Sequence, residues 1–122
     1  MAQILVVDDS STVRNEVGDY LKASGLSVAF AVDGRDGLAK LKADPAVKLV
    51  VCDVNMPNMD GLTMVEKIRG ELGNSTVNII MLTTESDESK KHEGQMAGAK
   101  AWVVKPFKPE QMLSAVQRLC LP

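Results

Sequence analysis

Four of the five short apolar runs in this 122-residue chain end in side chains that could do chemistry together. The side chains that follow these runs are Asp8, Asp9, Asp53, Thr83, Thr84 and Lys105. Oxygen ligands with no histidine or cysteine nearby suit a hard cation such as Mg²⁺. A carboxylate can also act as a nucleophile and form an acyl phosphate. The residue types therefore indicate metal-assisted transfer of a phosphoryl group.

The formal charges of these side chains point to a missing cation. Asp8, Asp9 and Asp53 together carry -3 and Lys105 returns +1, so a dication would bring the sum to zero. Mg²⁺ takes one or two carboxylates and leaves room for phosphate oxygens, and both Mg²⁺ and a lysine can stabilise a transferring phosphoryl group. On this hypothesis Asp53 is the phosphoryl acceptor. Any single position is more simply explained as a helix cap or a turn residue, so the hypothesis depends on the whole set.

An alternation of strands and helices would position these side chains. Apolar runs predict strands over residues 2–8, 26–32, 48–53, 77–82 and 101–104. Helical spacing predicts helices from Val13 to Gly25, over 34–43, from Leu62 to Leu72, over 86–98 and from Pro109 onward. This order predicts an α/β domain with a parallel sheet, and five strands are too few for an eight-fold barrel. We therefore expect a doubly wound (βα)₅ open sheet, which binds ligands beyond the carboxyl ends of its strands.

Composition limits the classes of function. The length and the 45% apolar content predict one domain over residues 1–122. A net charge of -2 argues against nucleic-acid binding. Without a cationic leader or an apolar run of about 20 residues, a cytoplasmic protein with no membrane insertion is expected. Cys52 and Cys120 form no metal or disulfide pattern, so both are predicted to be buried thiols.

The motifs resemble those of the receiver domains of two-component response regulators, in particular the stand-alone, CheY-like chemotaxis type. The segment LVVDDS matches the acidic pair of that family, and DVNMPNMDG matches its phosphorylation-site signature around Asp53. The segments MLTT and VVKPF match the switch hydroxyl, Thr83, and the family's lysine, Lys105. The resemblance spans essentially the whole chain and implies a flavodoxin-like sheet with strand order 2-1-3-4-5.

The resemblance also implies a metal site. Mg²⁺, for which Mn²⁺ could substitute, would be bound by Asp9, Asp53 and the backbone carbonyl of Asn55, with Asp8 assisting through water. Asn55 is also one of two residues that tune dephosphorylation in the family, the other being Glu85. This pair matches that of fast-decaying chemotaxis regulators.

The remaining implied residues concern the phosphate and the switch. Thr83, with Thr84 beside it, and Lys105 would contact the phosphoryl group, and the peptide bond between Lys105 and Pro106 would be cis. Trp102 falls where the family has a rotating aromatic residue. The alternative for Trp102 is a half-buried indole packed on the helix predicted over 86–98. Asp60-Gly61 needs no interpretation beyond a turn that leads into a helix.

The implied function is a phosphoacceptor that assists its own phosphorylation and dephosphorylation, and not an enzyme. The donor would be a sensor histidine kinase (CheA-like). The output would be a surface formed by residues 86–98, the last strand and the last helix, which would bind a flagellar or pilus motor component. We expect a monomer without an attached output domain. Two alternatives stay open: a relay that passes phosphate to a histidine phosphotransfer protein, and a phosphatase of the haloacid-dehalogenase class. The phosphatase would need a second aspartate where this chain has Asn55.

Overall fold

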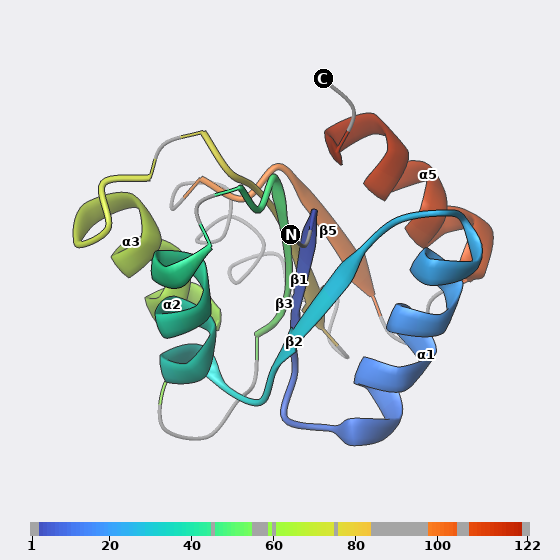
Figure 1. Ribbon diagram of the computed structural model, residues 1–122, viewed down its shortest axis with the longest axis horizontal. Helices are drawn as coiled ribbons and strands as arrows, with labels where there is room; N and C mark the ends of the chain where they lie inside the picture. Colours follow the sequence, from blue (N-terminus) through green and yellow to red (C-terminus); the bar gives the residue numbers. More distant parts are fainter. Residues whose placement is uncertain are drawn as a thin grey trace.

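The computed structural model describes residues 3–44, 46–54, 59, 61–74, 76–83, 98–104 and 108–120. Five strands form one parallel sheet in the order β2-β1-β3-β4-β5 (Figure 1). The strands are β1 (Ile4–Val7), β2 (Val28–Ala31), β3 (Leu49–Asp53), β4 (Asn78–Thr83) and β5 (Ala101–Val104). The predicted doubly wound sheet and its strand order are confirmed.

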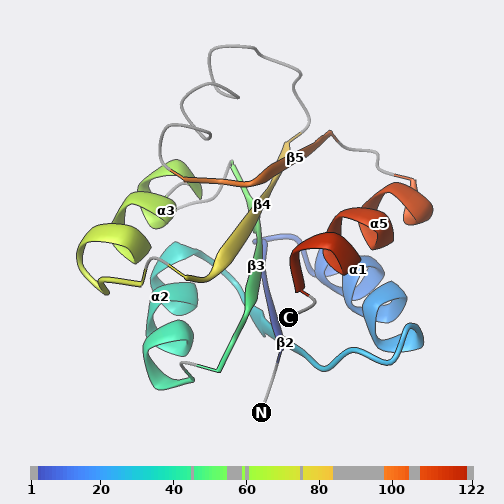
Figure 2. The same ribbon diagram turned by 90° about the horizontal axis from the view of Figure 1, so that it is seen from above.

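Four helices cover the two faces of the sheet within the described ranges. They are α1 (Ser11–Ala23), α2 (Gly34–Ala43), α3 (Gly61–Gly70) and α5 (Pro109–Cys120). Figure 2 shows α2 and α3 on one face and α1 and α5 on the other. The helix predicted over 86–98 lies outside the described residues, apart from its last position, Gly98.

Local sequence signals explain where the first two helices begin. The Ser10 hydroxyl caps α1 by accepting a hydrogen bond from the Val13 amide at 3.3 Å. The Asp33 carboxylate caps α2 in the same way and accepts from the Asp36 amide at 2.9 Å. Gly25 adopts a φ of 86° just after α1, a conformation that ends many helices. The bounds predicted for α2 and β5 agree with the structure residue for residue.

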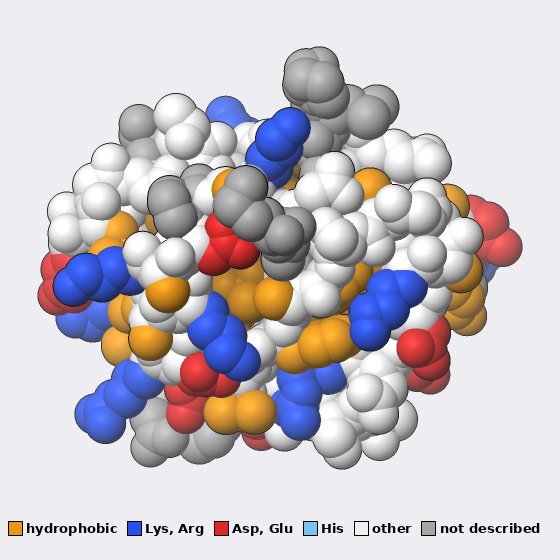
Figure 3. Space-filling view, in the orientation of Figure 1, with side chains coloured by type: hydrophobic (Ala, Val, Ile, Leu, Met, Phe, Trp, Pro, Cys, Tyr) orange, Lys and Arg blue, Asp and Glu red, His pale blue; other side chains and the backbone are white. Residues whose placement is uncertain are grey.

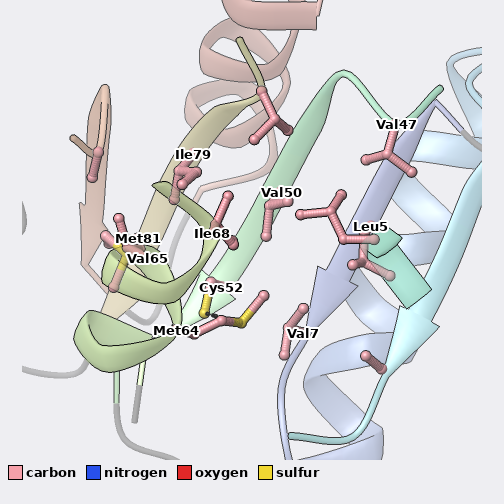
Figure 4. Close-up of a cluster of buried hydrophobic side chains, with 14 of the residues drawn as sticks. Leu5, Val7, Val47, Val50, Cys52, Met64, Val65, Ile68, Ile79 and Met81 are labelled. Carbon is pink, nitrogen blue, oxygen red and sulfur yellow. Dashed lines mark hydrogen bonds between the residues drawn. The ribbon is translucent and has the colours of Figure 1, made fainter. Parts of the chain in front are cut away.

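The alternation of side chains along each strand divides the core into two layers. One layer lies between the sheet and helices α2 and α3 (Figure 4), and it includes Val50, Cys52, Met64 and Met81. The other lies beneath α1 and α5. Burial on both faces accounts for the continuous apolar sequence of β3. Cys52 is a buried thiol as predicted, whereas the side chain of Cys120 lies outside the described set.

The prediction that Leu72 belongs to the third helix is wrong. Helix α3 ends at Gly70, and the Leu72 amide donates to the carbonyl of Lys67, five residues back, at 3.1 Å. Leu72 nevertheless packs against the core. The spacing of apolar residues therefore marked the buried face and not the last helical residue.

Candidate functional site

Three carboxylates meet at the carboxyl edge of the sheet. One carboxylate oxygen from each of Asp8, Asp9 and Asp53 lies within 4.8 Å of the others. Asp8 is completely buried and Asp53 is 5% exposed, whereas Asp9 is exposed to solvent. The cluster therefore opens toward solvent on the side of Asp9, and the predicted meeting of these three side chains is confirmed.

The turn between β1 and α1 holds Asp8 in place by its backbone and by its carboxylate. The Asp8 amide donates to the Ala31 carbonyl at 3.2 Å, and the Ser10 amide donates to Asp8 Oδ1 at 2.9 Å. The guanidinium of Arg14 donates to the Asp8 carbonyl at 2.6 Å. Nothing in the sequence distinguishes Arg14, because an arginine in the first turn of a helix looks like an ordinary solvated charge.

Asp53 is placed by the end of β3 and by a close backbone contact. It pairs with Leu82 in the sheet, and the next amide, that of Val54, donates to the Leu82 carbonyl at 2.9 Å. Gly61 returns to this point, where its amide donates to the Val54 carbonyl at 2.9 Å. A Cβ atom on Gly61 would lie 2.3 Å from the Asp53 carbonyl oxygen. Gly61 is thus more than the plain turn residue that the sequence indicated, because only glycine permits this approach.

The ends of the neighbouring strands are described in part. Thr83 is the last residue of β4 and pairs with Val104, the last residue of β5. Its backbone therefore lies at the carboxyl edge, while its side chain falls outside the described set. The other predicted site residues outside the described ranges are Asn55, Thr84, Glu85, Lys105 and Pro106.

Trp102 lies on β5 opposite Met81 of β4. Its side chain is half-buried and packs against the core layer beneath α2 and α3. The indole Nε1 is buried and has no hydrogen-bond partner among the described residues. A buried donor without an acceptor costs free energy. The half-burial agrees with the alternative of a packed indole, and the rotation of this ring remains a prediction.

The three carboxylates fit a hard divalent cation. They offer only oxygen donors, and the spread of up to 4.8 Å between the oxygen atoms can span an ion, since Mg²⁺–oxygen distances are about 2.1 Å. Three negative charges, two of them buried, repel one another without a cation between them.

The described part of the chain contains no helix long and apolar enough to cross a membrane.

Comparison with known proteins agrees with this fold. Residues 4–117 match the response regulator receiver domain family. The chain is 41% identical over 116 residues to chemotaxis protein CheY of Treponema pallidum, covering 93% of this chain and 79% of that protein. It is 32% identical over 115 residues to protein PilG of Pseudomonas aeruginosa, covering 94% and 84%. The structure of chemotaxis protein CheY4 of Vibrio cholerae superposes with a TM-score of 0.90 at 42% identity, over 98% of both chains.

The chain therefore belongs to the response regulator receiver domain family. Receiver domains are signalling modules that bind Mg²⁺ at an acidic pocket, and the cluster of Asp8, Asp9 and Asp53 is the acidic pocket of this chain.

Proposed function

We propose that Asp53 accepts a phosphoryl group from the phosphohistidine of a sensor kinase, and that this phosphorylation is the signal that the domain transmits. One observation carries the proposal. Asp53, a nearly buried carboxylate at a strand end, has the oxygens of Asp8 and Asp9 within 4.8 Å. This burial restricts access to a small reacting group presented at the open side of the cluster.

The proposed transfer is a displacement at phosphorus. An oxygen of Asp53 forms the new P–O bond as the P–N bond to the donor histidine breaks, and the histidine nitrogen keeps the electron pair. Mg²⁺, held by Asp9, Asp53 and the Asn55 carbonyl with Asp8 assisting through water, would supply charge stabilisation to the phosphoryl oxygens. Mn²⁺ could take its place. Lys105 would neutralise the new phosphate, and the Thr83 hydroxyl, with Thr84 beside it, would donate a hydrogen bond to it.

The downstream signal would pass to a binding surface. In this proposal, residues 86–98, β5 and α5 form that surface, and Trp102 responds to the state of Thr83. The names of the relatives in Treponema and Vibrio support a role in chemotaxis or motility. The donor would be a CheA-like kinase and the target a flagellar or pilus motor component. Asn55 and Glu85 would set the lifetime of the phosphoryl group.

Labelling of an Asp53→Asn variant tests the acceptor. Wild-type protein incubated with acetyl phosphate and Mg²⁺ should gain an acid-stable, hydroxylamine-labile phosphoryl group, and Asp53→Asn should gain none. Asp19→Asn is the matched control, because Asp19 is an exposed aspartate of α1. Labelling of the same peptide in Asp53→Asn would refute the assignment. Steady turnover of small phosphate esters by the wild-type protein would instead favour a phosphatase.

A further inference from the structure

Arg14 contacts the acidic pocket through the backbone rather than through a carboxylate. It lies in the first turn of α1, and its Nη1 atom donates to the carbonyl oxygen of Asp8 at 2.6 Å. Its own amide donates to the Ser10 carbonyl at 3.0 Å. The residue is therefore anchored at both ends, and it is half-buried. A charge-assisted hydrogen bond of this length is among the stronger ones in proteins.

This contact completes the fixation of the turn that carries Asp9. On the strand side, the Asp8 amide is bonded to Ala31 and its carboxylate to the Ser10 amide. Arg14 adds a donor for the Asp8 carbonyl, the group that forms the peptide bond to Asp9. Asp9 itself is exposed, so its position depends on the backbone on either side of it. The hydrogen bond from Arg14 to the Asp8 carbonyl therefore fixes the plane of the peptide bond between Asp8 and Asp9.

The positive charge of Arg14 has an opposite effect. The guanidinium is bonded to the carbonyl of Asp8, so it is separated from the Asp8 carboxylate by no more than the length of that residue. This separation is shorter than the Debye length of about 8 Å at physiological salt. A cation there repels a divalent metal. Removing Arg14 would thus weaken metal binding by loosening the turn and strengthen it by removing charge. The two effects predict opposite signs, so measuring the sign separates them.

We propose that Arg14 is a positioning residue of the acidic pocket, which holds the Asp8 carbonyl so that Asp9 is preorganised for the divalent cation. The proposal rests on the function proposed above. Outer partners that orient metal ligands are typically worth about 10- to 100-fold in metal affinity. Because Arg14 holds backbone and not a ligand atom, we expect the lower figure. The lost repulsion of a divalent ion at roughly 8 Å returns about two-fold once screening by physiological salt is included, so the net loss is about five-fold.

The test compares Mg²⁺ affinities of matched variants by calorimetry. Arg14→Met keeps the apolar stem but removes the donor and the charge, and it should bind Mg²⁺ about five-fold more weakly. Arg14→Lys keeps a donor and the charge and should bind within about two-fold of wild type. Arg118→Met is the control for net charge, because Arg118 is exposed in the last turn of α5, beside Leu119, whose carbonyl accepts a hydrogen bond from Asn78 at the start of β4. Its affinity should equal that of the wild type.

Unfolding in EDTA separates positioning from folding. If Arg14→Met unfolds at the same denaturant concentration as wild type but binds Mg²⁺ more weakly, the proposal is supported. Equal or tighter Mg²⁺ binding by Arg14→Met overturns it, since charge alone would then be at work. If Arg14→Met does not fold, the Lys variant decides: affinity within about two-fold of wild type supports the proposal, and a larger loss overturns it. A wild-type protein that binds no Mg²⁺ would refute the proposed function itself.

Discussion

The guanidinium of Arg69 donates a hydrogen bond of 2.9 Å to the carbonyl of Gly98, 29 residues further along the chain. The same group donates to the carbonyls of Asn74 at 3.1 Å and Val77 at 2.7 Å. Burial lowers the pKa of Arg69, although arginine stays protonated in proteins. This cation therefore joins the end of α3 to the residues that precede β4 and β5. Thr83, a proposed switch residue, is the last residue of β4, and Trp102, the other, is the second residue of β5.

Replacing Arg69 should destabilise the fold. Arg69→Met leaves three partly buried carbonyls without their shared donor, so the free energy of unfolding should fall by about 2–3 kcal/mol. Urea unfolding measures this change. Lys67→Met is the control, because Lys67 on the same helix forms an exposed ion pair with Glu71 at 2.9 Å, and such pairs contribute about 0.5 kcal/mol. Equal losses in the two variants would show that the three carbonyl contacts contribute nothing.

Gly98→Ala should cost more than Gly73→Ala. Both glycines have positive φ, 108° and 63°, so alanine strains the backbone at either site by about 1–2 kcal/mol. Only at Gly98 would the new Cβ also meet Arg69, with Nε at 3.0 Å; nothing lies within 4 Å at Gly73. Thermal unfolding should place Gly98→Ala clearly below Gly73→Ala. The gap should narrow when both are measured in an Arg69→Met background, and part of it should remain because a φ of 108° lies outside the left-handed helical region.

Gly61→Ala should damage the fold and the acidic pocket together. Its Cβ would meet the Asp53 carbonyl oxygen at 2.3 Å, and backbone cannot yield as a side chain can, so we expect a loss of about 3 kcal/mol or more. Gly37→Ala is the matched control: its nearest contact would be the flexible end of Met64 at 2.8 Å. If Gly61→Ala folds, acetyl phosphate labelling should drop while Gly37→Ala labels normally. Normal labelling of a folded Gly61→Ala would show that Asp53 does not depend on this approach.

Trp102→Phe should leave stability unchanged or raise it by up to about 1 kcal/mol. The change removes the buried Nε1 donor that has no partner among the described residues, and it keeps an aromatic ring against the core. Trp102→Ala should instead lose about 3 kcal/mol, since it removes the packing. Guanidinium unfolding followed by circular dichroism suits both variants, because Trp102 is the only tryptophan and its fluorescence is lost. A large loss of stability in Trp102→Phe would mean that the indole nitrogen donates a hydrogen bond in the folded protein.

The switch proposed for Thr83 has its own test. Thr83→Ser keeps a hydroxyl and should retain the amide shifts that a beryllofluoride mimic induces in residues 86–108, whereas Thr83→Ala should lose most of them. A charge-assisted hydrogen bond of about 1.5–3 kcal/mol can shift a two-state equilibrium by roughly ten- to a hundred-fold. Equal shifts in all three proteins would show that the signal takes another route.

The sequence predicted the sheet because its signals are local. Pro109 marks a helix start, and the apolar run of β3 ends at Asp53 itself. The meeting of Asp8, Asp9 and Asp53 followed from topology, because the carboxyl ends of parallel strands share an edge. Helix ends were predicted less accurately, as Leu72 shows. The spacing of apolar residues indicates which face of a segment is buried. In this segment the buried face continues to Leu72, beyond the end of α3 at Gly70.

Contacts between distant segments could not be predicted in this way. Arg14 and Arg69 look alike in sequence, each an arginine on an amphipathic helix. Their functions depend on which carbonyl lies within reach, and for Arg69 that carbonyl belongs to a residue 29 positions away. Gly61 looks like any glycine after an aspartate. Its close approach to the Asp53 carbonyl exists only because β3 and α3 meet at that point.

The surface of the molecule is charged, with basic and acidic side chains interspersed over the face shown in Figure 3. The thiol of Cys52 lies beneath the surface and is completely buried. Its sulfur lies 3.7 Å from Met64 Sδ and 3.4 Å from the carbonyl oxygen of Asp53. A thiol reagent can reach it only when β3 and α3 separate. With Cys120 changed to serine, the rate of Cys52 alkylation therefore times the opening of the strand that carries Asp53. A ligand at concentration [L] that binds only the closed state with dissociation constant Kd should slow alkylation by a factor of 1 + [L]/Kd. The alkylation rate of Cys52 would therefore report ligand binding beside the proposed phosphorylation position.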